Sequence, residues 1–126
     1  GGDRVVVYGK TVHNYDFRDR PAYPVCVSIL RDPTALRVLV EEHPTVVHLR
    51  DPETGKTLLQ VAVEKQDERA VEALLQSRAR IGLLRDKWGN TPMSVAVKAK
   101  SKGIVQLILQ AVLDKRVSNS PGSMAA

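Results

Sequence analysis

The chain has 126 residues, of which 43% are hydrophobic and 4% aromatic, and its formal net charge is +5. This composition suffices for one compact domain whose core is built from Val, Leu, Ile and Ala, and so few aromatic residues fit close helix packing better than a large ligand cavity. The single Cys26 excludes an intramolecular disulfide and a zinc site built on cysteines, and no apolar run approaches the ~20 residues that span a bilayer. We therefore expect a protein of a reducing compartment, the cytoplasm or the nucleus, without a membrane segment or a signal peptide.

Residues 1–21 differ in pattern from the rest of the chain. A β-branched run at 4–7, a glycine at 9 and a second partly apolar run at 10–13 predict a strand or a short hairpin. We interpret this segment as a cap over the first helix pair, or as a piece of a preceding domain. The main domain is expected from residue 22 to 117, and the small, polar residues 118–126 are expected to be a disordered tail.

From residue 22 to 42 the apolar pattern is helical, with an interruption at Asp32 and Pro33. An Asp that caps a helix, followed by Pro at the first helical position, is a strong start signal. A first helix is therefore expected to end near Leu30 and a second to begin at Pro33. The second is expected to end before Pro44, because the residue that precedes a proline disfavours the α region.

Two later units repeat each other at a separation of 34 positions. The matched pairs are Gly55 with Gly89, Thr57 with Thr91, Ala62 with Ala96, Val71 with Val105 and Leu75 with Leu109. Leu-Arg-Asp also recurs, at 49–51 and 84–86. A shift of 35 positions brings the first unit into the same register, and each unit then has a possible helix cap before its second helix. These caps are Asp32, Asp67 and Ser101.

The third unit opens with Asp86, Gly89 and Thr91 in the spacing D-x-x-G-x-T, and continues as Thr-Pro-Met-Ser-Val-Ala up to Ala96. This stretch resembles the opening of an ankyrin repeat, in which such a turn leads into T-P-L-H-x-A. The resemblance covers residues 22–115 and implies an all-α fold, a stack of about three helix pairs with short β-turn fingers. The chain departs from the family pattern at Leu58, where the family has Pro, and at Gln60 and Ser94, where it has His.

The resemblance implies a protein–protein interaction module, a scaffold or adaptor domain within a larger protein. Such a stack binds its partner on the concave face that the fingers and first helices form. The positions expected on that face are Glu53, Lys56, Gln60, Glu64, Arg85, Lys87, Trp88, Asn90, Ser94 and Lys98. Trp88 is the foremost of them because Trp is enriched among binding hot spots. Packing of Trp88 over the neighbouring finger is the alternative.

Residues 77–102 contain seven basic residues and one acid, Asp86. The basic residues are Arg78, Arg80, Arg85, Lys87, Lys98, Lys100 and Lys102. Such a cluster attracts an acidic or phosphorylated protein segment, and it also attracts nucleic acid. Electrostatic binding of nucleic acid or of an acidic ligand is therefore an alternative function. An ordinary solvated face explains the cluster equally well, since no nucleic-acid motif accompanies it.

No pattern of residues indicates catalysis or a cofactor. The stretch 55–57, Gly-Lys-Thr, matches the end of a phosphate-binding loop, but Arg50 stands where that loop needs its first glycine. None of the three histidines has a second His or Cys at the spacing of metal ligands. Cys26 is expected to be a buried, inert thiol. We therefore expect no enzyme, no catalytic residue, no cofactor and no metal site.

The last helix is apolar around most of its circumference. Between residues 104 and 113 only Gln106 and Gln110 are polar. A terminal repeat normally needs a polar outer face, so something is expected to cover this helix: a further repeat, a partner or a second copy of the chain. Self-association through Leu107 and Val112 is the simplest of these options.

Overall fold

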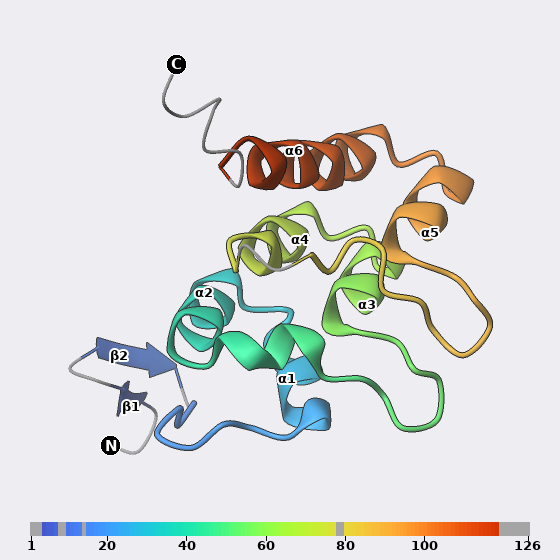
Figure 1. Cartoon of the computed structure of the whole chain (residues 1–126). Helices are drawn as coiled ribbons and strands as arrows, with labels where there is room; N and C mark the ends of the chain where they lie inside the picture. The colour runs from blue at the N-terminus through green and yellow to red at the C-terminus, as the bar shows by residue number, and fades with distance from the viewer. Residues whose placement is uncertain (1–3, 8–9, 14, 78–79, 119–126) are drawn as a thin grey trace.

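The computed structural model of the chain describes residues 4–7, 10–13, 15–77 and 80–118, with side chains over 15–77 and 80–113. Three helix pairs follow one another along the chain. They are α1 (Tyr23–Ile29) with α2 (Pro33–Glu42), α3 (Leu58–Glu64) with α4 (Glu68–Leu75), and α5 (Pro92–Lys98) with α6 (Lys102–Ser118). The first helices α1, α3 and α5 stack in one row and the second helices α2, α4 and α6 in another (Figure 1). The predicted all-α stack of helix pairs is confirmed.

The repeat register read from the sequence is also that of the helices. α3 and α5 occupy positions 34 apart, and so do the first residues of α4 and α6. α1 and α2 begin 35 positions before α3 and α4. A 3-10 helix, η1 (Pro44–His48), follows α2 and buries two adjacent valines, an element that the sequence pattern did not predict. Short 3-10 helices of this kind are frequent connectors between α-helices.

Two of the three predicted caps are confirmed. The carboxylates of Asp32 and Asp67 each accept a hydrogen bond of 3.1 Å from the third residue beyond, at the start of α2 and of α4. Ser101 precedes α6 as predicted, and its carbonyl oxygen accepts the first helical bond, from Val105. Its hydroxyl oxygen, however, is buried and has no hydrogen-bond partner within the described part of the chain. The prediction that the Ser101 side chain caps α6 is therefore wrong.

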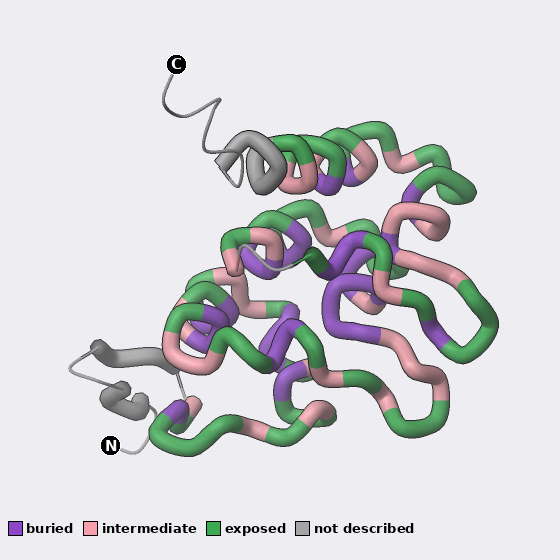
Figure 2. Tube along the Cα trace, viewed as in Figure 1, coloured by how far each residue is buried: buried purple, intermediate pink, exposed green. Residues whose placement is uncertain are grey.

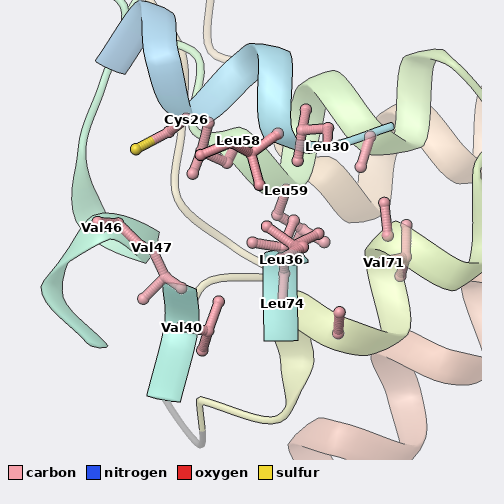
Figure 3. Close-up of a cluster of buried hydrophobic side chains, with 14 of the residues drawn as sticks. Cys26, Leu30, Leu36, Val40, Val46, Val47, Leu58, Leu59, Val71 and Leu74 are labelled. Atoms are coloured by element: carbon pink, nitrogen blue, oxygen red, sulfur yellow. The ribbon is translucent and has the colours of Figure 1, made fainter. Parts of the chain in front are cut away.

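The core runs continuously through the stack. Leu36, Leu59 and Leu74, from α2, α3 and α4, belong to one buried cluster (Figure 3). Ala62 and Ala96 have no exposed surface, as expected where a first helix packs closely against its neighbours. Cys26 is fully buried, and this burial raises the pKa of its thiol to about 11. The expectation of a buried thiol is thus confirmed.

The N-terminal segment forms the predicted hairpin. Strand β1 (Arg4–Val7) pairs antiparallel with β2 (Lys10–His13), and β2 lies against α2 (Figure 1). This contact supports the prediction that the segment caps the first repeat. The chain is helical to residue 118, and the rest of the predicted tail, 119–126, lies outside the described residues. Over the ranges that the structure describes, no helix has both the length and the apolar character to cross a membrane.

Candidate functional site

Two turns project from the stack at the N-terminal ends of α3 and α5 (Figure 1), and we name them finger 1 (residues 51–57) and finger 2 (residues 86–91). Finger 1 is closed by a hydrogen bond of 2.9 Å from the Asp51 amide to the Lys56 carbonyl, and finger 2 by one of 2.8 Å from the Asp86 amide to the Asn90 carbonyl. Each finger contains a glycine in the left-handed region, with φ of 75° and 86°. Both glycines therefore adopt the positive φ that the sequence predicted for these turns.

The two fingers are joined to each other. The amide of Lys87 donates a hydrogen bond of 2.8 Å to the Thr54 carbonyl. The guanidinium of Arg50 donates one bond of 3.0 Å to the Gly55 carbonyl and a second to the Arg85 carbonyl. A Cβ atom at Gly55 would lie 3.0 Å from the Lys87 nitrogen, so the fingers touch at this point. Backbone–backbone and side-chain bonds thus hold both fingers as one platform.

Asp86 organises finger 2 from within. Only 7% of it is exposed, and one carboxylate oxygen accepts hydrogen bonds from the amides of Trp88 (2.9 Å) and Asn90 (2.8 Å). The other oxygen accepts a bond of 2.8 Å from the side-chain amide of Gln60 on α3. Burial alone raises the pKa of Asp86, but the bonds from Gln60, Asn90 and Trp88 outweigh it and hold this pKa below its usual value. The charged carboxylate is therefore the form that holds the finger.

Trp88 lies at the tip of finger 2 and is 62% exposed. The amine of Lys87 lies 5.8 Å from the centre of its ring, and that of Lys56, from finger 1, lies 6.0 Å from it. Both distances are within the range of a cation–π interaction. Lys56 also forms an ion pair of 2.9 Å with Glu64 on α3. Trp88 thus contacts the neighbouring finger through Lys56 and remains largely exposed as a residue.

The remaining candidate residues fall into three groups. The exposed ones are Glu53, Glu64, Arg85, Lys87 and Lys98, and the half-buried ones are Lys56, Asn90 and Ser94. The Ser94 hydroxyl is already engaged, since it accepts a hydrogen bond of 2.9 Å from the Thr91 amide in a capping box. Gln60 is 1% exposed. The expectation that Gln60 faces a partner is wrong, because its side chain turns inward to Asp86.

Of the basic cluster, six members are exposed and Arg78 lies outside the described residues. The exposed members are Arg80, Arg85, Lys87, Lys98, Lys100 and Lys102. On α6, the proposed self-association residues Leu107 and Val112 are half-buried, whereas Leu109 and Leu113 are exposed. Arg50 was not among the expected site residues. The recurring Leu-Arg-Asp was the signal in the sequence that could have indicated it.

Helix pairs in a constant register, joined through hydrogen-bonded fingers, are the architecture of one repeat family. The sequence model of that family, described as ankyrin repeats in three copies, matches residues 25–119. The chain belongs to the ankyrin-repeat family. Ankyrin repeats indicate a protein–protein interaction module, and such repeats are not themselves catalytic.

Among curated proteins, this ankyrin-repeat chain is similar to the serine/threonine-protein kinase VIK of Arabidopsis thaliana. The two are 36% identical over 77 residues, which are 61% of this chain and 17% of the kinase. The chain therefore spans less than a fifth of the length of that relative. No solved structure matches it significantly.

Proposed function

We propose that this ankyrin-repeat chain binds a partner protein through the surface of fingers 1 and 2 and the adjoining α3 and α5. The observation that carries the proposal is the exposed side chain of Trp88, with the amines of Lys56 and Lys87 lying 6.0 and 5.8 Å from the centre of its ring. An aromatic side chain of this kind supplies a large contact area at a low cost in conformational entropy. It is held on a finger that hydrogen bonds already fix in shape.

The rigidity of the platform favours binding. Trp88 is held at its amide by Asp86, and its neighbour Lys87 is held at its amide by Thr54. A surface that is ordered before binding loses less conformational entropy when a partner docks. The fingers therefore act as a preorganised surface, as opposed to loops that fold around a ligand.

The charges around Trp88 favour an acidic partner. Three basic residues are exposed near the ring, namely Arg85 just before finger 2, Lys87 in finger 2 and Lys98 at the end of α5, whereas Asp86 is buried. The positive charge of Lys56 is partly offset by its ion pair with Glu64. We infer that the partner offers an apolar side chain to the Trp88 ring and carboxylate or phosphate groups to the lysines beside it.

Peptide display on the whole chain tests this proposal. Peptides selected on the wild type are expected to be enriched in Asp and Glu next to an apolar residue. Trp88→Ala is expected to weaken the selected peptides by about tenfold or more, and Lys87→Glu to weaken them further at low salt. Arg69→Glu, an equivalent charge reversal at an exposed position of α4, is the matched control and is expected to leave affinity unchanged. Peptides that bind the Trp88→Ala variant as tightly as the wild type would contradict the proposal.

Electrostatic binding of nucleic acid is a second candidate, favoured by the six exposed basic residues of the cluster. Fluorescence anisotropy with generic single-stranded and double-stranded probes distinguishes it. Binding to phosphates weakens steeply as salt is added. If neither probe binds at low salt, this second candidate is removed and the peptide proposal is unaffected.

A further inference from the structure

An open groove lies on the outer side of the last repeat, between α5 and α6, with a volume of about 540 Å³. Its lining consists of Val97, Lys100, Lys102, Val105, Gln106 and Leu109. The Val97 side chain is 56% exposed and that of Leu109 is 46% exposed. Leu113, one helical turn beyond Leu109, is also exposed. Much of α6 is exposed (Figure 2), and its exposed residues include Leu109 and Leu113 beside Gln106 and Gln110.

The preceding repeat shows what such a surface packs against. Val97 and Val105 stand 34 positions after Val63 and Val71. Val63 and Val71 have no exposed surface, and they lie on α3 and α4, against which α5 and α6 pack. The apolar part of the groove is therefore the counterpart of residues that are buried one repeat earlier, where the helices of the next repeat pack. A helix is accordingly the kind of element that we expect to cover it.

The chain itself does not provide the next helix in register. The residues 34 positions after Gly89 and Thr91 are Ser123 and Ala125, so the finger pattern is not repeated. α6 also continues to residue 118, which makes it 17 residues long, whereas α4 has 8 residues. Residues 119–126 thus do not encode a further repeat in this register, and we look to a partner for a helix that covers the groove.

The charge at the rim narrows the choice of partner. Lys100 and Lys102 are both exposed there, and no acid is among the lining residues that the structure describes. The position equivalent to Lys102 in the preceding repeat is Glu68. A second copy of the chain, itself of net charge +5, would add the same two lysines to the interface. Carboxylates on the partner complement this rim.

We propose that the groove between α5 and α6 binds an amphipathic helix of a partner protein, with carboxylates flanking its apolar face. This surface is separate from the fingers, so it allows the chain to hold two partners at once. The apolar face covers Val97, Val105 and Leu109, and the carboxylates pair with Lys100 and Lys102.

Two synthetic peptides of about 18 residues, or five helical turns, test the proposal with the whole chain. Both carry the same Leu and Ala stripe, and one has Glu and the other Lys at the flanking positions. The Glu peptide is expected to bind about tenfold tighter than the Lys peptide at low salt. The double variant Lys100→Glu/Lys102→Glu is expected to reverse this preference, and Leu109→Glu is expected to weaken the binding of both peptides.

Controls separate this site from the fingers and from misfolding. Trp88→Ala is expected to bind the Glu peptide as the wild type does, even if it removes binding at the fingers. Val97→Lys changes a further lining residue of the groove. The thermal unfolding of each variant is measured alongside, and it distinguishes loss of the binding site from loss of the fold. Equal affinity for the two peptides, or no binding of either, would overturn the proposal. A dimer in sedimentation that Leu109→Glu dissociates would also overturn it, because the occupant would then be a second copy.

Discussion

The side-chain amide of Gln60 lies 2.8 Å from the buried carboxylate of Asp86, so a residue of α3 anchors the finger of the following repeat. Because both groups are buried, neither can replace this hydrogen bond with water. Gln60 thus stabilises the platform that carries Trp88 without facing a partner itself.

We expect Gln60→Leu to destabilise the chain by about 1–3 kcal/mol, since it leaves a buried carboxylate with one hydrogen bond fewer. Urea unfolding followed by circular dichroism measures this difference. Gln110→Leu, at an exposed position of α6, is the control and is expected to change the free energy of unfolding by under about 0.5 kcal/mol. Equal effects of the two substitutions would show that the bond to Asp86 adds nothing to stability.

Asp86 is expected to make stability depend on pH. Its pKa is lower in the folded chain than in the unfolded one, where it is about 3.9. The folded state therefore gains stability from the charged carboxylate above that value, and loses it as the pH falls through the folded pKa. Melting temperatures of the wild type and Asp86→Asn, measured from pH 7 downward, are expected to differ most near neutrality and to converge in acid. A constant difference at every pH would contradict this account.

Ala62→Leu and Ala96→Leu are each expected to cost about 1–3 kcal/mol, because a larger side chain has no room where the helices meet. Both alanines are fully buried. Ala99→Leu, at the exposed end of α5, adds the same atoms without a clash and serves as the control. Thermal unfolding distinguishes the three variants. If all three variants have the melting temperature of the wild type, the close packing at Ala62 and Ala96 is not a determinant of stability.

The helix caps are expected to differ in strength. Asp32→Ala and Asp67→Ala each remove a cap bond of 3.1 Å and should cost about 0.5–2 kcal/mol. Ser101→Ala removes a buried hydroxyl that has no partner among the described residues, so it is expected to be neutral or stabilising. Chemical denaturation of the three variants ranks them. A loss at Ser101 as large as that at Asp67 would mean that the hydroxyl caps α6 in solution.

The parts of the fold that could be predicted are those set by local chemistry. Asp32 and Pro33 start α2 through a cap bond and a fixed φ, and Gly55 and Gly89 supply positive φ in the fingers. The register followed from these local signals because they recur at a near-constant spacing. The helix pairs and their order were therefore accessible from the sequence alone.

The errors concern contacts between repeats. The helical position of Gln60 predicts that it lies on the concave face, but its burial depends on where Asp86 of finger 2 lies, 26 positions later. Arg50 was overlooked because its acceptors are the carbonyls of Gly55 and Arg85, and a backbone carbonyl has no identity in a sequence. Ser101 has the right residue type for a cap, but its buried hydroxyl has no hydrogen-bond partner among the described residues, which the residue type alone does not reveal.

The bridge that Arg50 makes between the fingers affects how the platform fluctuates. Since Arg50 and the bond from Lys87 to Thr54 span both turns, opening one turn requires breaking bonds to the other. The two turns should therefore open as one cooperative unit, and the Lys87 amide should exchange its hydrogen slowly for a residue in a solvent-exposed turn. A ligand held by Trp88 would then slow exchange in finger 1 as well, which links the second repeat energetically to whatever the third repeat binds.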